Sequence, residues 1–252
     1  MIDTHIHADA RSSEDFEKMY SAGIETAITC AYHPYLSDNT TVLLNSLEKI
    51  LNYDTRRVEN YGIDLKVALG IHPTNCLSNP QPIYEKLYDW IENKNIVAIG
   101  EIGLETGTSK EITIFEEQLK IADETKTKVI VHTPRKNKSE ILDKILKIIP
   151  TKCDEKLVVI DHINKNVVSK VINLDYTLGL TVQPQKMEVN EAIGILNEYG
   201  FEKFLLNSDM SYKPSDPLSV PKTVCELKNR GFEDKEVEKI AYKNAINFFN
   251  LF

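Results

Sequence analysis

Short strand-like segments alternate with helical patterns along all 252 residues of the chain. Most of these segments are apolar and rich in β-branched residues, which is typical of buried parallel strands covered by crossover helices. Eight strands are predicted, at residues 1–7, 25–31, 65–71, 96–101, 128–132, 156–162, 176–182 and 204–209. Eight strand–helix units in about 250 residues fit a closed (β/α)8 barrel of the α/β class.

Helical periodicity fills the intervals between these strands. Helices are predicted at residues 14–22, 40–61, 82–93, 112–125, 139–149, 166–174, 189–199, 219–229 and 234–250. An open doubly wound sheet is the alternative, but it would usually carry a glycine-rich phosphate turn after its first strand. His5-Ile6-His7-Ala8-Asp9 stands there instead. No long polar linker divides the chain, so we expect one TIM-barrel domain over residues 1–252.

The composition narrows the possible classes of function. Hydrophobic residues make up 42% and charged residues 27%, as in soluble globular proteins. No apolar run approaches the roughly 20 residues that span a membrane. The four cysteines form no CxxC pair, which favours a reducing, cytoplasmic location. A formal net charge of −8 argues against a broad nucleic-acid-binding surface, although not against a local cationic pocket.

The histidines fall at or just after predicted strand ends, where barrels carry their chemistry. His5 and His7 project to the same side of the first strand, so together they could hold one divalent ion such as zinc. Taken alone, such a pair is equally expected on a surface strand. His33 is as consistent with a surface position as with substrate contact. The strand-end positions shared with His72, His132 and His162 favour a metal site.

Two acidic residues also stand at the ends of predicted strands, like the histidines. Glu101 follows the apolar segment 96–100, and Asp209 follows the segment 204–208. An acid after a buried strand costs several kcal/mol unless it is paired or binds a metal. The parity of Glu101 matches that of Val97 and Ile99, which predicts an inward-facing side chain. The structural alternatives are an ion-paired acid and, for Asp209, a loop cap.

These residues together resemble the TatD-like metal-dependent hydrolases, an amidohydrolase-type barrel family that includes the TatD deoxyribonucleases. The matching segments run in the family order over nearly the whole chain: Ile2-Asp3-Thr4-His5-Ile6-His7, Gly70-Ile71-His72-Pro73, Gly100-Glu101-Ile102-Gly103-Leu104, Val131-His132, Asp161-His162, Ser208-Asp209 and 244–249. The resemblance implies a (β/α)8 barrel with two divalent ions, such as zinc, magnesium or manganese.

The resemblance also implies a role for each residue. One ion would be held by His5, His7, Glu101 and Asp209. The second would share Glu101 as a bridge and add His132 and His162. His72 stands where the family places a histidine that lines the substrate pocket.

A metal-activated water would then carry out hydrolysis, with Glu101 and Asp209 as catalytic residues and Asp209 orienting the water or accepting its proton. Arg135 could hold a phosphate with its planar guanidinium. Arg135, with the neighbouring Lys136 and Lys138, could instead form a solvated basic loop, and Lys213 has the same two readings. The expected enzyme is therefore a phosphodiesterase or deoxyribonuclease acting on a small phosphoester or a DNA end, as a monomer or small homo-oligomer.

Three segments depart from the family pattern, namely Leu104-Glu105-Thr106, Thr133-Pro134-Arg135 and Met210-Ser211-Tyr212-Lys213. These segments belong to loops that select the substrate in a barrel. A hydrolase of a small amide, lactone or phosphoester therefore remains the alternative. A barrel that binds metal without turnover is a third reading.

Overall fold

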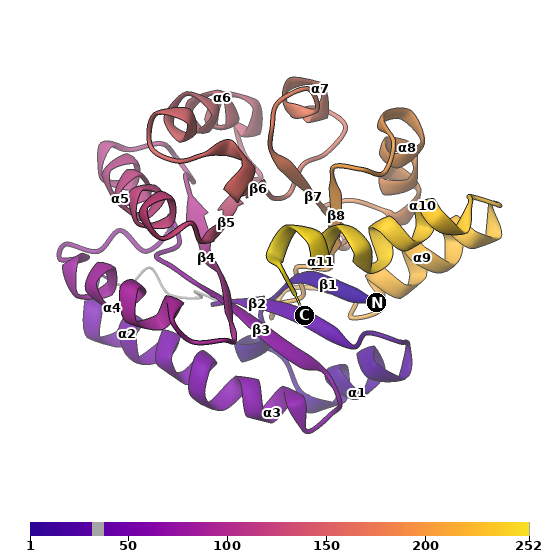
Figure 1. Cartoon of the computed structure of the whole chain (residues 1–252), viewed down its shortest axis with the longest axis horizontal. Helices are drawn as coiled ribbons and strands as arrows, with labels where there is room; N and C mark the ends of the chain where they lie inside the picture. The colour runs from indigo at the N-terminus through magenta and orange to yellow at the C-terminus, as the bar shows by residue number, and fades with distance from the viewer. Residues whose placement is uncertain (32–37, 252) are drawn as a thin grey trace.

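The computed structural model describes residues 1–31 and 38–251, and it contains one eight-stranded parallel sheet in the order β1 to β8 (Figure 1). Every predicted strand is present, although most are shorter than predicted. The strands are β1 Ile2–Ile6, β2 Thr26–Cys30, β3 Asp64–Leu69, β4 Ile96–Gly103, β5 Lys128–His132, β6 Val158–Ile160, β7 Thr177–Thr181 and β8 Phe204–Asn207. His33 lies outside the described residues.

The sheet closes between its first and last strands. Ile6 forms a parallel bridge with Met210, and the backbone N–H of His7 donates to the carbonyl oxygen of Met210 at 2.9 Å. The backbone N–H of Asp209 donates in turn to the carbonyl oxygen of His5 at 2.9 Å. The predicted (β/α)8 barrel is therefore confirmed, and the open doubly wound sheet is excluded.

Helices surround the strands as an outer ring (Figure 1). They are α1 Ser13–Ser21, α2 Thr40–Lys49, α3 Thr55–Glu59, α4 Gln81–Ile91, α5 Ser109–Thr125, α6 Lys138–Ile148, α7 Val168–Val171, α8 Val189–Tyr199, α9 Ser219–Asn229, α10 Asp234–Glu238 and α11 Asn244–Phe249. π-Helical turns at Ile50–Asp54 and Lys239–Lys243 interrupt the two longest predicted helices. Within the described ranges, no helix is long and apolar enough to cross a bilayer.

The predicted helix over 166–174 is wrong in extent, because only α7 is α-helical there. The side chain of Asn164 accepts a hydrogen bond from the backbone N–H of Asn166 at 3.1 Å. The backbone carbonyl oxygen of Asn164 accepts hydrogen bonds from the N–H groups of Val167 and Val168. An asparagine that bonds to the backbone in this way holds a turn and delays the start of a helix.

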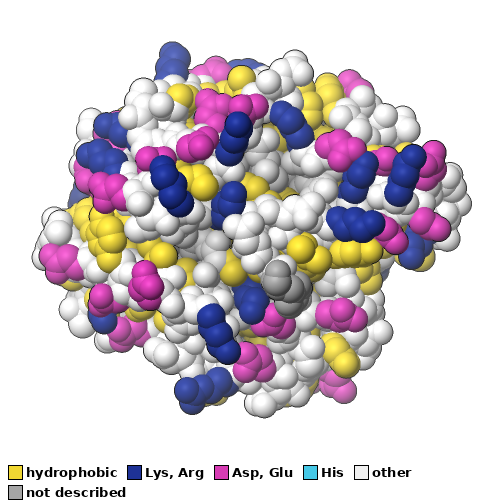
Figure 2. Space-filling view, viewed as in Figure 1, with side chains coloured by type: hydrophobic (Ala, Val, Ile, Leu, Met, Phe, Trp, Pro, Cys, Tyr) yellow, Lys and Arg dark blue, Asp and Glu magenta, His cyan; other side chains and the backbone are white. Residues whose placement is uncertain are grey.

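The inside of the barrel is divided into an apolar end and a polar end. Small and branched residues such as Ile28, Ala98 and Ile130 pack together with Phe248 and Phe249 near the C-terminus. Helix α11 therefore covers the amino ends of the strands, where Lys128 Nζ lies 4.7 Å from the centre of the Phe248 ring. Figure 2 shows this face, on which cationic and anionic side chains are interspersed and no histidine is visible among the described residues. The carboxyl ends are left for the polar residues.

Candidate metal centre

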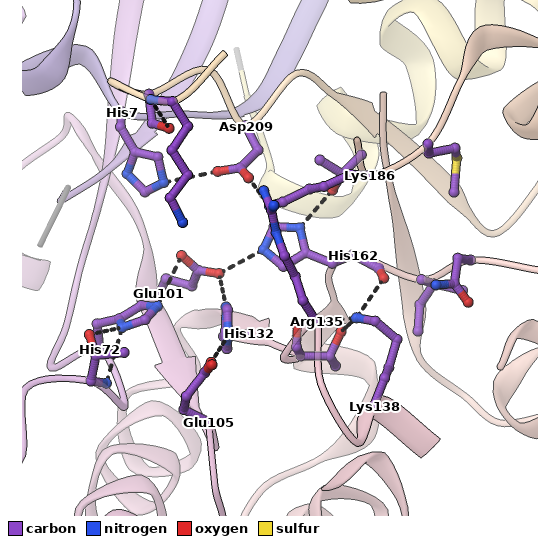
Figure 3. A pocket seen from close by; sticks show the side chains of 18 of the residues that line it. His7, His72, Glu101, Glu105, His132, Arg135, Lys138, His162, Lys186 and Asp209 are labelled. Atoms are coloured by element: carbon purple, nitrogen blue, oxygen red, sulfur yellow. Dashed lines mark hydrogen bonds and ion pairs between the residues drawn. The ribbon is translucent and has the colours of Figure 1, made fainter. Parts of the chain in front are cut away.

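The predicted site residues meet at the carboxyl end of the barrel (Figure 3). A cavity of about 520 Å³ opens there. His5 is fully buried beneath it, and the other seven predicted residues line it: His7, His72, Glu101, His132, Arg135, His162 and Asp209. Segments more than 200 residues apart in the chain therefore share one pocket.

Glu101 lies at the centre of this group. Its Oε1 is 2.7 Å from His132 Nδ1 and 2.9 Å from His162 Nε2. Its Oε2 is 3.5 Å from His5 Nε2 and 3.7 Å from His72 Nε2. Burial alone would raise the pKa of this carboxyl, but the neighbouring His5 and His132 hold the pKa well below its usual value. Glu101 is therefore a carboxylate whose two oxygens face different pairs of imidazoles.

Glu101 does face the site, but its strand does not have the parity predicted from Val97 and Ile99. Ile99 packs in the outer core between strands and helices, whereas Ala98 packs inside the barrel. Regular alternation would therefore turn Glu101 outward with Ile99. The pairing of β4 with β5 shifts between Gly100 and Ile102, and a shift of one residue exchanges the two faces of a strand.

Asp209 and His7 form a second contact at the other side of the pocket. Asp209 Oδ1 is 3.0 Å from His7 Nε2 and 4.0 Å from His5 Nε2. Lys186 and His7 hold the pKa of Asp209 well below its usual value in spite of burial. A carboxylate oxygen between two imidazole nitrogens is a suitable oxygen ligand for a divalent cation.

Asp161 orients the buried His5. Its Oδ2 lies 2.6 Å from His5 Nδ1, and its Oδ1 accepts hydrogen bonds from the His162 N–H at 2.9 Å and from Asn207 Nδ2 at 2.8 Å. His5 Nε2 is buried and has no hydrogen-bond partner among the described residues. A carboxylate that binds one ring nitrogen commonly leaves the other nitrogen for a metal.

The donor set fits divalent metal ions. Among the residues that the structure describes, three groups bring potential ligand atoms within 4.8 Å of one another, namely His5–His7–Asp209, His5–Glu101–His162 and His72–Glu101–His132. Burial lowers the pKa of His162 to about 4, so this imidazole is neutral at pH 7, as a ligand must be. His72, predicted as a substrate residue, belongs to the third of these groups, with its Nε2 3.7 Å from Glu101 Oε2. Imidazole and carboxylate donors accept zinc, manganese and similar ions.

Comparison with known proteins agrees with this geometry. A family model described as "TatD related DNase" matches residues 2–250. The chain belongs to the TatD-related DNase family. An uncharacterized metal-dependent hydrolase of Methanocaldococcus jannaschii is 42% identical over 253 residues and is matched along its whole length, as is this chain. The TatD-family assignment therefore places the chain among metal-dependent hydrolases.

Solved structures extend the comparison to the fold. A TatD-like protein from Archaeoglobus fulgidus has a TM-score of 0.83 and 30% identity, with both chains fully covered. A phosphotriesterase homology protein from Escherichia coli, complexed with phosphate in its active site, has a TM-score of 0.71 at 15% identity, with 98% of each chain covered. At that identity the second likeness concerns the barrel alone.

This TatD-family chain contains site contacts that sequence reasoning missed. Glu105 Oε2 lies 2.9 Å from His132 Nε2, and Lys186 pairs with Asp209. Both residues come from loops, where no periodicity marks a side chain as inward-facing. Asp161 is predicted only as part of the Asp161-His162 segment, with no role of its own. Its position after a buried strand is the signal that identified Glu101, and the same signal could have identified Asp161.

The basic residues after His132 differ in their surroundings. Arg135 lines the pocket, and its Nη2 donates to Gln183 Oε1 at 3.1 Å. Lys138 Nζ donates to Thr133 O at 3.1 Å, to Thr133 Oγ1 at 2.6 Å and to His162 O at 3.0 Å. Burial and the nearby Lys186 lower the pKa of Lys138 to about 7. Lys138 thus ties the loops after β5 and β6 together, while Arg135 reaches into the pocket.

Proposed function

We propose that this metal-dependent hydrolase cleaves phosphodiester bonds, acting on DNA ends or on small phosphodiesters, with two divalent ions around Glu101. The observation that carries the proposal is the position of that carboxylate. One of its oxygens faces His132 and His162, while the other faces His5 at 3.5 Å. A carboxylate in this arrangement can bridge two cations.

The ligands are assigned from these contacts and from the family order. His5, His7, Glu101 and Asp209 would hold one ion, and Glu101, His132 and His162 the other. When bound, divalent cations lower the pKa of water toward about 7 and polarise phosphoryl oxygens. Zinc, magnesium and manganese are all compatible with nitrogen and carboxylate donors.

The remaining roles belong to the side chains around the reacting group. Asp209 Oδ1 faces His7 and its Oδ2 pairs with Lys186, and this carboxylate would orient the attacking water or accept its proton. Arg135 would hold a phosphoryl oxygen with its planar guanidinium. His72 Nδ1 lies 2.8 Å from Thr74 Oγ1, which fixes the ring with Nε2 toward Glu101 and the substrate space.

The pocket favours an anionic substrate over a neutral amide or lactone. Its lining carries more cationic than anionic side chains, although the whole chain has a formal net charge of −8. A cavity of about 520 Å³ is of a size that holds small molecules, so a strand end fits better than a duplex groove. The small phosphoester stays the alternative substrate within the same chemistry.

A substrate panel tests the proposal. The purified protein is given Mg²⁺, Mn²⁺, Co²⁺ or Zn²⁺ together with single-stranded DNA, bis-p-nitrophenyl phosphate, and small amides and lactones. We expect metal-dependent release of nucleotides and p-nitrophenol, abolished by a chelator. Hydrolysis confined to amides or lactones would reject the phosphodiester assignment, and inactivity on every substrate with metal bound would reject an enzymatic role.

Arg135→Ala should raise the KM for bis-p-nitrophenyl phosphate while leaving kcat nearly unchanged. A hydrogen bond to a charged group contributes about 1.5–3 kcal/mol, so an increase of about tenfold or more is expected. Steady-state kinetics on the wild type, Arg135→Ala and Arg135→Lys measure it, with Lys expected to recover part of the loss because it keeps the charge without the fork. An unchanged KM would show that Arg135 does not bind the phosphoryl group.

A further inference from the structure

Lys186 is held over the site by a tight turn in the loop between β7 and α8. The Gln183 N–H donates to the Met187 carbonyl oxygen at 3.2 Å, and the Lys186 N–H donates to the Gln183 carbonyl oxygen at 2.9 Å. Gln185 adopts a left-handed backbone conformation with φ of 68°. Gln183 Nε2 also donates to the carbonyl oxygens of Ser208 and Asp209, which attaches the turn to the end of β8. The backbone therefore directs Lys186 toward the candidate metal centre.

The ammonium group of Lys186 has donors to spare. Its Nζ pairs with Asp209 Oδ2, while the Oδ1 of the same carboxylate faces His7. Within the part of the chain that the structure describes, Asp209 is the only acceptor for Lys186, whereas Lys138 uses three acceptors. An ammonium carries three N–H donors, so two of those on Lys186 have no protein acceptor among these residues.

The surroundings of Lys186 favour a negatively charged ligand. Its side chain is 15% exposed, and it lines the pocket on the side away from His72 (Figure 3). Among the described residues, the lining contains five basic side chains and three carboxylates: Arg135, Lys136, Lys138, Lys186 and Lys213, against Glu101, Glu105 and Asp209. Bound divalent ions would add further positive charge. A partly buried, positively charged cleft concentrates anions.

Arg135 completes the arrangement. Its guanidinium and the turn that carries Lys186 meet at Gln183, whose Oε1 accepts from Arg135 Nη2 at 3.1 Å. Both cationic side chains line the same pocket as His162 (Figure 3). A planar fork beside an ammonium group provides donors for two oxygens of one phosphate.

We infer that Lys186 is a further substrate-binding residue, whose ammonium group binds a phosphoryl oxygen beside Asp209 and forms an anion subsite with Arg135. The substrate class is therefore an anionic phosphoester rather than a neutral ester or amide. The inference deepens the proposed function and rests on it for the reaction, but anion binding can be measured without turnover.

Calorimetric titration of manganese-loaded protein with inorganic phosphate tests the inference. Lys186→Met should weaken phosphate binding by about tenfold or more, and Lys186→Arg should recover most of it. Lys165→Met is the matched control, because Lys165 is an exposed lysine on the β6–α7 loop that does not line the pocket. Its phosphate affinity should equal that of the wild type.

The manganese content of each variant distinguishes two roles of Lys186. It could bind phosphate directly, or it could only position Asp209 as a metal ligand. Lys186→Met that keeps its manganese and loses phosphate affinity supports the subsite, even if neither DNA nor bis-p-nitrophenyl phosphate is cleaved. Equal phosphate affinity in Lys186→Met and the wild type would overturn the inference. So would a wild type that binds no phosphate, or a Lys186→Met variant whose weaker binding follows from lost manganese.

Discussion

Glu101→Ala should lose both divalent ions, whereas His132→Ala should mainly lose one. Glu101 is the only predicted ligand that faces histidines of both proposed metal sites. Its carboxylate lies 2.7 Å from His132 Nδ1 and 3.5 Å from His5 Nε2. Removing Glu101 takes away the one carboxylate that faces ring nitrogens of both His5 and His132. The loss of metal affinity should exceed the roughly 10–100-fold that removal of an outer partner of a ligand costs. Elemental analysis after dialysis against limiting manganese measures the stoichiometry.

Glu92→Ala serves as the control for this experiment. Glu92 is an exposed residue at the end of α4 that does not line the pocket, and the substitution removes the same kind of carboxylate. It should keep the metal content of the wild type. Equal metal content in Glu101→Ala and the wild type would reject the bridging role, and with it the shared centre.

Gly179→Ala should weaken metal binding and destabilise the barrel although residue 179 is not a ligand. A Cβ on Gly179 would overlap Asp161 Oδ1 and lie 2.7 Å from Asp161 Cγ. Asp161 holds His5 Nδ1 at 2.6 Å, so its displacement would release the most buried imidazole of the site. We expect about 10–100-fold weaker metal binding and a loss of about 1–3 kcal/mol in unfolding free energy. Manganese titration and thermal unfolding measure the two effects.

Gly194→Ala is the matched control for Gly179→Ala. Gly194 lies inside α8, and an added Cβ there would have no neighbour within 4 Å. Alanine is favoured over glycine in a helix by roughly 1 kcal/mol, so this variant should be slightly more stable and bind metal normally. A Gly179→Ala protein with unchanged melting temperature and metal affinity would show that Asp161 does not position His5.

The barrel could be predicted because strand–helix alternation is a local property of the chain. Apolar segments such as Val129, Ile130 and Val131 identify a strand without reference to its neighbours. Register is different, since it depends on how two strands pair. The shift between Gly100 and Ile102 has no local signature, and the orientation of Glu101 was therefore predicted for the wrong reason.

The histidines and acids of the site were predictable because they stand where strands end. Loop residues were not, since their direction depends on turn geometry and on distant anchors. Lys186 is one of 30 lysine and arginine residues, and only the attachment of Gln183 to the end of β8 places it beside Asp209. Lys138 differs from Lys186. It follows Arg135 in the segment predicted to contact phosphate, but its Nζ donates to backbone carbonyl oxygens of Thr133 and His162 and so connects two loops.

The closure between β1 and β8 has a consequence for biosynthesis. The backbone groups of His5 and Asp209 are hydrogen-bonded to each other, so the two ends of the ligand set join only when the last strand docks. A ribosome-bound chain that has emerged as far as β7 carries His5 and His7 but still lacks Asp209. Complete loading with metal is thus expected only after translation of the final strand. Full metal occupancy would then indicate that the barrel has finished folding.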